Sequence, residues 1–466
     1  MFKKNDLTDV IITDMTNEGE GVGKADGFAF FVKDTLIGDE VRIRVTKVKR
    51  SYGYGRLEKV LKPSVNRIEP VCPVSRQCGG CQIQNMSYEA QLDFKENKVK
   101  NNLVRIGGFS KEYIDEISEK IMGADNRFNY RNKAQFPVGI DKDGNTVVGF
   151  YAGRTHSIIP CTDCAIGVRE NDSILKKMLD LMNRYGISAY DEKAGTGLLR
   201  HILLRKGFHT GQIMICFVIN GDDLPHNEQI VSGLLELQDD LKREYGSSIE
   251  SISYSINKAD TNVIMGEDYR VIYGKDTIED TLLGLEFAIS PLSFYQINPE
   301  QVEKLYEKAI EYADIKENEE VWDICCGIGT ITLAMARKAA KVHGIEIVPQ
   351  AIDDARENAK RNGIKNAEFI CAAAEDHLPA NAEKIHADVI VMDPPRKGMD
   401  PRAIEAVLKA HPSKIVYVSC DSATLSRDLK ILCDGGYELK KIQPVDMFPQ
   451  TVHCEVIAAL NLEEII

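Results

Sequence analysis

The stretch that decides the fold is Asp323-Ile324-Cys325-Cys326-Gly327-Ile328-Gly329-Thr330. An apolar run over residues 321–324 predicts a strand that leads into this stretch, and a helical pattern over residues 331–339 follows it. Glycines at such a junction let the backbone approach a ligand closely at the positively polarised start of a helix. A Gly-x-Gly pair alone is a weak signal, because ordinary turns contain it as well.

Two further strand ends carry polar motifs in the same part of the chain. Gly344-Ile345-Glu346 ends a second predicted strand with an acid, 23 residues after Asp323, and this position suits ribose hydroxyls. Asp393-Pro394-Pro395-Arg396 follows a third predicted strand. Strands and helices alternate from about residue 298 onward, which predicts an α/β fold with a mostly parallel, doubly wound sheet. Together the motifs resemble those of a class I, Rossmann-like S-adenosylmethionine methyltransferase.

A cysteine and a glutamate near the C-terminus are the candidate reactive groups. Cys420 follows a strand predicted over residues 415–418, level with Asp393, and this position favours a nucleophile. The alternative is a buried structural thiol, the usual fate of a cysteine beside a strand. Glu455 lies near the start of the last predicted strand, residues 452–460, where it suits a general base. Isolated glutamates are, however, mostly surface acids.

The N-terminal part, residues 1–62, predicts a small β-barrel with glycine-rich turns between its strands. The net charge of the whole chain is −13, which taken alone argues against a nucleic-acid partner. Residues 41–68 nevertheless contain nine basic residues and a single acid, Glu58. Such a stripe favours phosphate binding, and it also fits a solvated surface. The basic residues are Arg42, Arg44, Lys47, Lys49, Arg50, Arg56, Lys59, Lys62 and Arg67.

Five of the twelve cysteines form a candidate metal site. Cys72, Cys78 and Cys81 lie close together in the sequence, and Cys161 or Cys164 offers a fourth thiolate. A disulfide scaffold is not expected, because cytosolic thiols stay reduced. Four thiolates suit a structural zinc ion and an iron–sulfur cluster about equally.

Length and composition predict a globular protein of several domains. The chain has 466 residues, of which 43% are hydrophobic and 28% charged, and this excludes a disordered chain, a collagen and a coiled coil. No run reaches the ~18 apolar residues of a spanning helix, and no signal peptide is visible. We expect a cytoplasmic protein without a membrane partner, and the sequence indicates no protein partner. The predicted domains are the barrel at 1–62, a mainly β domain with a cysteine-rich loop at 63–290, and the α/β domain at 291–466.

Essentially the whole chain resembles the RNA (uracil-5-)-methyltransferase family, in particular its 23S rRNA branch. The N-terminal part resembles a TRAM domain, a small RNA-binding β-barrel. The resemblance implies transfer of a methyl group from S-adenosylmethionine to C5 of a uridine in 23S rRNA. The matching motifs are Ser293-Phe294-Tyr295-Gln296-Ile297-Asn298, Asp323–Thr330, Asp393–Arg396, Val418-Ser419-Cys420 and His453-Cys454-Glu455.

The resemblance also implies roles for individual residues. Cys420 matches the nucleophile and Glu455 the general base. The positions that match donor-binding residues are Gln296, Cys325, Glu346 and Asp393. The family usually has Tyr at the position of Cys325 and Asn at that of Asp421, so this chain departs from it at a cofactor contact and beside the nucleophile. The 23S rRNA branch carries a [4Fe–4S] cluster on a similar spacing, which implies the ligands Cys72, Cys78, Cys81 and Cys164, with zinc as the alternative.

The chemistry of uracil explains these residue types. C5 is a poor nucleophile, but addition of a thiolate to C6 makes it carbanion-like, and a base must remove the C5 proton after methylation. The target base has to be flipped out of the folded RNA to reach such a site. Three alternatives remain: the tRNA-directed branch, which typically lacks the barrel and the cysteine cluster; amino-methylation of adenine or cytosine, which needs no cysteine; and a non-enzymatic RNA-binding or iron–sulfur protein.

Overall fold

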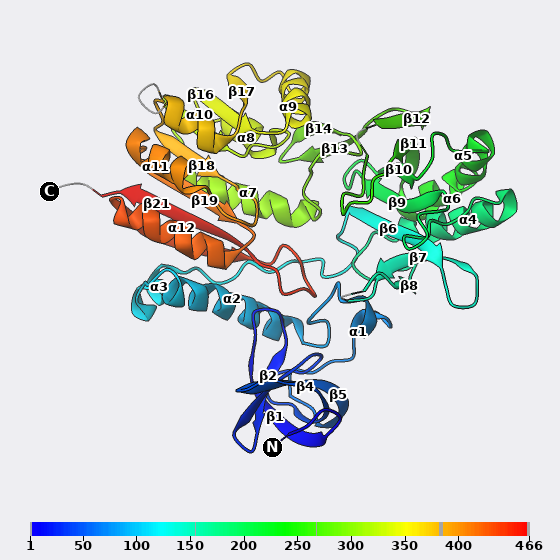
Figure 1. Ribbon diagram of the computed structural model, residues 1–466. Helices are drawn as coiled ribbons and strands as arrows, with labels where there is room; N and C mark the ends of the chain where they lie inside the picture. Colours follow the sequence, from blue (N-terminus) through cyan, green and yellow to red (C-terminus); the bar gives the residue numbers. More distant parts are fainter. Residues whose placement is uncertain (1, 154, 267, 382–384, 464–466) are drawn as a thin grey trace.

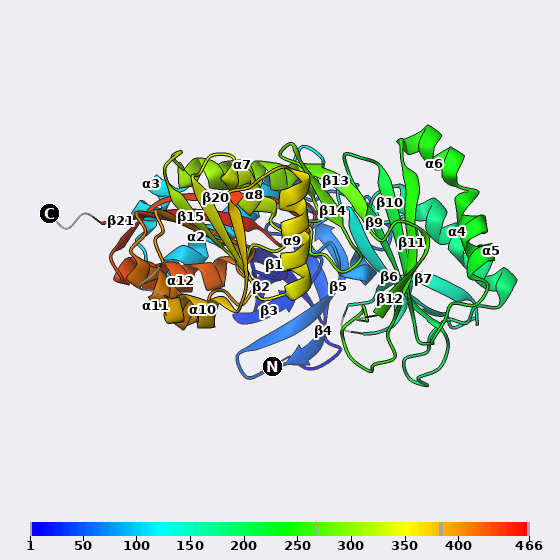
Figure 2. The ribbon, with the colours of Figure 1, turned by 90° about the horizontal axis from the view of Figure 1, so that it is seen from above.

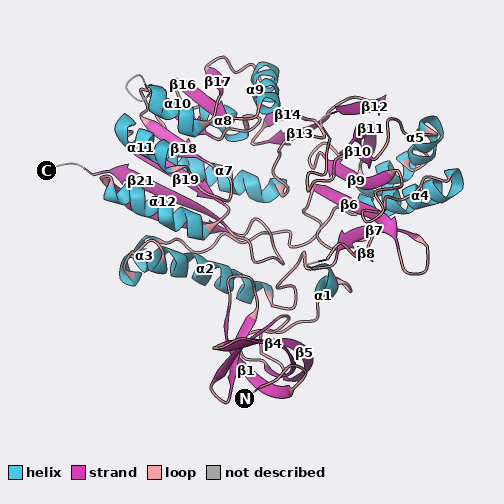
Figure 3. Ribbon diagram, in the orientation of Figure 1, coloured by secondary structure: helices cyan, strands magenta, loops and turns pink. Residues whose placement is uncertain are grey.

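The computed structural model describes residues 2–153, 155–266, 268–381 and 385–463, which form three packed units (Figure 1). A small barrel lies beneath the junction of two larger units, and the view from above shows these two side by side over it (Figure 2). Helices cover both faces of the sheet in the C-terminal unit and one face of the sheet in the central unit (Figure 3). Among the described residues, no helix is long and apolar enough to cross a bilayer.

The N-terminal unit is a closed barrel with the strand order β1-β2-β3-β5-β4, which confirms the predicted barrel. The strands are β1 (Leu7–Met15), β2 (Gly21–Ala25), β3 (Phe28–Val32), β4 (Glu40–Val48) and β5 (Tyr52–Lys62). Alternate side chains such as Val41 and Ile43 fill the interior. The sequence does not predict β2 and β5, because glycines occupy inward positions where an apolar residue would mark a strand. A Cβ added at Gly23 would lie 2.3 Å from the oxygen of Ile11, so these positions have no room for a side chain.

Two helices from the first quarter of the chain pack on the C-terminal unit. The helices before the central sheet are α1 (Ser75–Cys78), α2 (Tyr88–Arg105) and α3 (Lys111–Ile117). Apolar residues at near-helical spacing over residues 88–106 predict a helix there, and the bounds of α2 confirm it. Val99 of α2 and Ile114 of α3 share one buried core with Leu429 of the C-terminal unit. Figure 1 shows both helices running alongside that unit.

The central unit is a seven-stranded sheet with the order β12-β11-β10-β9-β6-β7-β8. Its elements are β6 (Lys133–Ile140), β7 (Thr146–Tyr151), β8 (Ile158–Pro160), α4 (Glu170–Tyr185), β9 (Leu199–Lys206), β10 (Gln212–Ile219), α5 (Asn227–Leu235), α6 (Gln238–Tyr245), β11 (Ser248–Ile256) and β12 (Asp268–Gly274). Apolar side chains of α4 and α5, among them Met178 and Ile230, pack on Phe217 of the sheet. Strand β10 is apolar and buried from Ile213 to its end because it lies in the interior of this sheet.

The C-terminal unit has the predicted α/β fold, with the sheet order β17-β16-β15-β18-β19-β21-β20. Strands β15 to β19 are all parallel to one another, and β21 is antiparallel to both of its neighbours, β19 and β20. A hairpin and α7 precede the sheet. The elements are β13 (Ile278–Leu282), β14 (Leu285–Ile289), α7 (Pro299–Ala313), β15 (Glu320–Ile324), α8 (Thr330–Ala336), β16 (Lys341–Glu346), α9 (Pro349–Arg361), β17 (Ala367–Cys371), α10 (Ala374–Asn381), β18 (Val389–Met392), α11 (Pro401–Ala410), β19 (Lys414–Ser419), α12 (Ser422–Asp434), β20 (Tyr437–Val445) and β21 (Glu455–Leu462).

Two buried cores cover the two faces of this sheet. Helices α7, α8 and α9 and the β13–β14 hairpin contribute to one core, and α2, α3, α10, α11 and α12 contribute to the other. The last strand begins at Glu455, three residues later than predicted. The preceding backbone N–H groups bond to side chains instead, that of Val452 to Gln82 and that of His453 to Thr451.

Candidate active site

The four motif-bearing strands end at the same edge of the C-terminal sheet. β16, β15, β18 and β19 are adjacent and parallel, so the residues that follow them lie side by side. This arrangement gathers Cys325, Glu346, Asp393 and Cys420. The sequence-predicted site residues of the C-terminal unit are therefore brought together by topology rather than by proximity in the chain.

The turn after β15 is held in a compact shape by its own backbone. The N–H groups of Cys325 and Cys326 both donate to the oxygen of Ile345, at 2.9 Å each. Cys325 has φ of +72°, and Gly327 and Gly329 also adopt positive φ values, which favour glycine. The motif's glycines thus permit the turn, while Cys325 takes the left-handed conformation despite its side chain.

Buried carboxyl groups surround this turn. Thr332 donates to Oδ2 of Asp323, and Oδ1 of Asp323 is buried without a hydrogen-bond partner. Glu346 accepts from the N–H of Val348 at 3.0 Å through Oε1 and from that of Gly327 at 3.3 Å through Oε2. Burial raises the pKa of Asp323 and of Asp393 to about 7 each. Such acceptors fit a ligand that carries an ammonium group and ribose hydroxyls, as S-adenosylmethionine does.

Cys420 and Glu455 meet across two antiparallel strands. β19 pairs with β21 so that Ser419 lies opposite Val456, and the next position in this register places Cys420 opposite Glu455. Glu455 is only 5% exposed, and burial, followed by the charge of Asp393, raises its pKa to about 8 while Arg396 opposes this shift. Burial, then Glu455 and Asp393, raises the pKa of Cys420 to about 11. The thiol and the two acids therefore share one desolvated environment.

Asp421, where the family usually has Asn, caps the helix that follows Cys420. Its side chain accepts from the N–H of Ala423 at 2.8 Å and from that of Thr424 at 3.2 Å, at the start of α12. Asp and Asn serve equally well at this position of a helix. The first turn of α12 thus begins two residues after Cys420.

A hydrogen bond to a buried tyrosine links Gln296 to the same edge of the sheet. The backbone oxygen of Gln296 accepts from Nδ2 of Asn132 at 3.1 Å, and its side chain hydrogen-bonds Tyr306 of α7. The hydroxyl of Tyr306 lies 3.2 Å from Oγ1 of Thr330, and burial followed by the charge of Asp393 raises its pKa. Sequence analysis missed Tyr306, whose buried position on α7 is also that of an ordinary core residue.

A buried ion pair holds the loop that leads to Glu455. Nζ of Lys95, on α2, donates to Oδ1 of Asp446 at 2.5 Å, and neither side chain has exposed surface. Tyr88 donates to Oδ2 of Asp446 at 2.8 Å, and Lys95 also donates to the oxygen of Phe448 at 3.0 Å. Sequence analysis missed Lys95. Its spacing of four residues from the buried Val99, on the face that α2 buries, is the signal that could have found it.

The five cysteines of the N-terminal half come together in space. Burial, then Cys164, Cys78 and Cys72, raises the pKa of Cys81 to about 12. Cys161 has its pKa raised to about 12 by burial and by three of the same thiols. The backbone N–H groups of Ile166 and Gly167 bond to the sulfur of Cys164 and so oppose the rise of its pKa through burial. In this conformation, no group of three or more His, Cys, Asp or Glu residues within the described ranges is arranged as metal ligands.

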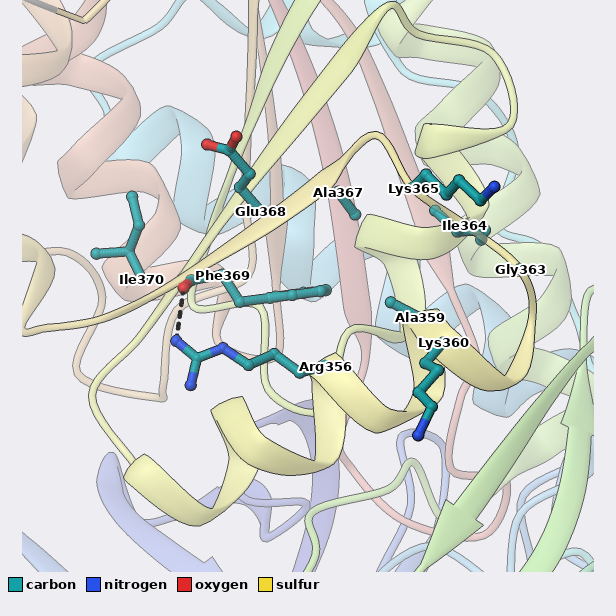
Figure 4. Close-up of a pocket in the computed structure, with 10 residues that line it drawn as sticks. All are labelled: Arg356, Ala359, Lys360, Gly363, Ile364, Lys365, Ala367, Glu368, Phe369 and Ile370. Carbon is teal, nitrogen blue, oxygen red and sulfur yellow. Dashed lines mark hydrogen bonds between the residues drawn. The ribbon is translucent and has the colours of Figure 1, made fainter.

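A cavity of about 640 Å³ between α9 and β17 lies apart from these groups (Figure 4). Arg356, Lys360 and Phe369 contribute to its lining, and Arg356 donates to the oxygen of Phe369 at 3.0 Å. None of the sequence-predicted site residues lines it. The cavity is therefore not the place where the candidate reactive groups gather.

Comparison with known proteins identifies the family. The sequence model of tRNA (Uracil-5-)-methyltransferase matches residues 226–462, and that of the TRAM domain matches residues 3–57. A relative from Clostridium tetani, named an uncharacterized RNA methyltransferase, is 46% identical over 460 residues, which are 98% of this chain and 97% of the relative. One with a similar name from Halalkalibacterium halodurans is 44% identical over 461 residues, covering 99% and 98% of the two chains.

A solved structure agrees with this result. The tRNA (uracil-54, C5)-methyltransferase of Pyrococcus abyssi, in complex with S-adenosyl-L-homocysteine, is 27% identical, with a TM-score of 0.77. The match covers 97% of this chain and 99% of that one. The fold and the sequence similarity are those of an S-adenosylmethionine-dependent RNA methyltransferase. The chain belongs to the uracil-5-methyltransferase family, and its N-terminal barrel is a TRAM domain.

Replacing Lys95 with Met should destabilise the protein by about 3–5 kcal/mol, because it leaves Asp446 buried without a counter-charge. Urea denaturation measures the loss. Adding Asp446→Asn to this variant should recover much of it. Lys100→Met on the same helix is the matched control, since the partly exposed Lys100 pairs with Glu96 and Asp115 and should cost about 1 kcal/mol or less. Equal losses for the two single variants would contradict this account.

Glu455→Gln should stabilise the protein in a pH-dependent manner. The pKa of Glu455 rises on folding from its ordinary 4.5 to about 8, so the wild type loses stability as pH rises through this interval. Gln does not ionise, and the melting temperature of the variant should therefore exceed that of the wild type more at pH 8.5 than at pH 5. Glu228→Gln, at an exposed site on α5, controls for a general effect of removing a carboxylate. A difference in melting temperature between variant and wild type that shrinks toward high pH would refute the raised pKa of Glu455.

Proposed function

We propose that the protein transfers a methyl group from S-adenosylmethionine to C5 of a uridine in 23S rRNA, through a covalent bond between Cys420 and uracil C6. The observation that carries this proposal is the register of β19 and β21, which sets Cys420 opposite the buried Glu455 at the edge that also holds Asp393. An amino-methyltransferase needs no such thiol. The RNA-modifying role also suggests a cytoplasmic location.

Each step of the reaction is assigned to a residue of this chain. Sγ of Cys420, as thiolate, adds to C6 of the flipped uracil, and the electron pair moves to C5. S-adenosylmethionine supplies the electrophilic methyl group that C5 takes, and S-adenosylhomocysteine is the leaving group. Glu455, as carboxylate, then removes the proton from C5, and the bond between Sγ and C6 breaks to restore the double bond and free Cys420. Asp393, whose charge acts on both residues, makes the potential of the pocket more negative near the methylsulfonium cation.

The donor site is assigned to the strand-end residues. Glu346 suits the ribose hydroxyls, and Oδ1 of Asp323, which has no partner, suits an ammonium group. Gln296 and Asp393 complete the set on the side of Tyr306. Cys325, where the family usually has Tyr, offers its backbone turn rather than an aromatic ring.

A tRNA uridine is the second candidate substrate. The presence of a barrel does not separate the two, because the Pyrococcus abyssi tRNA enzyme matches this chain over 97% of its length. The preference for 23S rRNA rests on the cysteine cluster and on the family branch that the spacing Cys72-x5-Cys78-x2-Cys81 resembles. Methylation assays with unmodified 23S rRNA and unmodified tRNA distinguish them, and methylation of tRNA alone would overturn this preference.

We further propose that Cys72, Cys78, Cys81 and Cys164 hold a [4Fe–4S] cluster. The mutual influence of these thiols on their pKa values supports their proximity, and the N–H groups directed at Cys164 suit an anionic sulfur. The cluster would serve the fold or the RNA contact, since the thiols belong to a part of the chain that holds none of the proposed catalytic residues.

Cys420→Ala should abolish turnover and the formation of a covalent adduct with RNA that contains 5-fluorouridine, while binding of S-adenosylmethionine stays near the wild-type level. The reason is that the fluorine at C5 blocks the final proton abstraction and traps the Cys420 adduct. Gel electrophoresis under denaturing conditions measures the adduct. Cys433→Ala, a partly buried thiol on α12 in the same unit, is the matched control and should still form it. An adduct that persists in Cys420→Ala would refute the mechanism.

Protein purified without oxygen should be brown and contain about four iron atoms and four sulfides per chain, as a [4Fe–4S] cluster requires. Iron and sulfide assays and the visible absorption spectrum provide the measurement. Cys164→Ser should lose the iron, and Cys161→Ser should retain it. A colourless protein with one tightly bound zinc ion would favour the alternative, and the reverse result for the two variants would make Cys161 the fourth ligand.

A further inference from the structure

Three aromatic rings form a cluster on the outer face of the N-terminal barrel. Phe31 of β3 and Tyr54 of β5 are direct partners in a parallel ladder, and Tyr52 lies two residues before Tyr54 on the same face. The ring centroids are 5.4 Å apart for Phe31 and Tyr52, 5.7 Å for the two tyrosines, and 5.8 Å for Phe31 and Tyr54. All three side chains are partly exposed. They make up what we call the aromatic cluster.

The barrel interior does not require this cluster. The neighbours of Phe31 in the chain, Phe30 and Val32, point inward and have no exposed surface. On β5 the inward positions belong to Gly53 and Gly55, where an added Cβ would lie 2.7 Å from the ring of Phe30 and 2.6 Å from Ile43. The core is therefore already filled, and the rings of the aromatic cluster pack on one another at the surface.

Cations without ion-pair partners border the aromatic cluster. Lys47 is the ladder partner of Tyr54, and the N–H of Lys49 donates to the oxygen of Tyr52 at 2.8 Å. Lys47 lies near the end of β4, and Lys49 and Arg50 lie in the turn that follows it; we call these three the turn cations. Within the described residues, none of the three makes an ion pair with a carboxylate. Most of the other basic residues of the stripe are paired, namely Arg42 with Asp9, Arg44 and Arg56 with Glu58, Lys62 with Glu40, and Arg67 with Asp39.

We propose that the aromatic cluster and the turn cations Lys47, Lys49 and Arg50 bind a single-stranded segment of the RNA substrate, whose bases stack on the rings while its phosphates contact the cations. The inference rests on the proposed RNA substrate and adds the form in which the barrel binds it. Exposed aromatic faces beside lysine and arginine are the combination that recognises unpaired nucleotides. A duplex offers phosphates but no free base faces, so it would use the cations alone.

The charge complementarity is local. The chain carries a net charge of −13, so RNA is repelled over much of the surface and must be attracted where cations are not neutralised. Within the stripe of residues 41–68, carboxylates neutralise five of the nine cations. The turn thus concentrates the remaining positive charge next to the rings.

The test measures the affinity of the full-length protein for a fluorescent single-stranded RNA of about twelve nucleotides without uridine, and for a duplex of the same length, at several salt concentrations. Tyr52→Leu/Tyr54→Leu should weaken binding of the single strand by tenfold or more and leave duplex binding unchanged, because stacking contributes ~1–3 kcal/mol per base. Tyr52→Phe/Tyr54→Phe is the matched control that keeps the rings and should bind as the wild type does. Melting temperatures and S-adenosylmethionine binding verify that each variant is folded.

The contribution of the cations is measured separately. Lys47→Ala/Lys49→Ala/Arg50→Ala should weaken binding of both RNAs and reduce the steepness of the log–log salt dependence by about 2 for the single strand. Arg42→Ala/Lys62→Ala, which removes two paired cations, should change the affinity and the salt dependence much less. Wild-type affinity of the leucine variant for the single strand would overturn the stacking proposal, as would equal losses for single strand and duplex.

Two further results are distinguishable. Tight binding of a polyglutamate peptide that depends on the same cations and excludes RNA would assign the surface to an acidic protein partner and overturn the proposal. The uridine-free probe cannot be methylated at uracil, so its binding is independent of the reaction. If no RNA is methylated but this binding pattern holds, the proposed reaction fails and the binding surface stands.

Discussion

The candidate site depends on one antiparallel register, that of β19 and β21. These strands pair from Lys414 with Asn461 through Ser419 with Val456, so the residues just beyond the ladder, Cys420 and Glu455, face each other. A slip of β21 by one residue would place Glu455 on the other face of the sheet, away from Cys420. The remaining parts of the C-terminal unit act around this pair: parallel strands bring Asp393 and the glycine turn to the same edge, and α12 begins two residues after Cys420.

The electrostatics of the site work against the stability of the fold. Asp323, Asp393 and Glu455 are acids whose pKa values burial raises to about 7, 7 and 8. Concentrating such groups is costly, and the pattern is typical of functional sites. The fully buried pair of Lys95 and Asp446 fixes the loop before Glu455 to α2. Helix α2, from the first quarter of the chain, thus holds Asp446, a residue near the C-terminus. This contact explains why α2 packs on the C-terminal unit.

The sequence predicts those parts of the structure that depend on local patterns. The motif Asp323–Thr330, the acid Glu346 and the helix over residues 88–106 all follow from glycine spacing, strand ends and helical periodicity. The strands β2 and β5 are not predicted from the sequence because glycines fill their inward positions. Only the packed barrel shows that these positions have no room for a side chain. Pairs distant in sequence, such as Lys95 with Asp446, are likewise invisible before folding, as is the neutralisation of Arg44 by Glu58. The resemblance to a known family supplied the assignment of Cys420 and Glu455, and the β19–β21 register provides a physical reason for it.

The central claim is that the methyl group replaces hydrogen at uracil C5. The most direct test uses RNA labelled with tritium at uridine C5 and S-adenosylmethionine labelled with ¹⁴C in its methyl group. The proposed mechanism predicts that tritium enters the water in equal amount to the ¹⁴C gained by the RNA, because Glu455 removes the C5 proton after each transfer. Incorporation of ¹⁴C without release of tritium would place the methyl group on another atom and contradict the account.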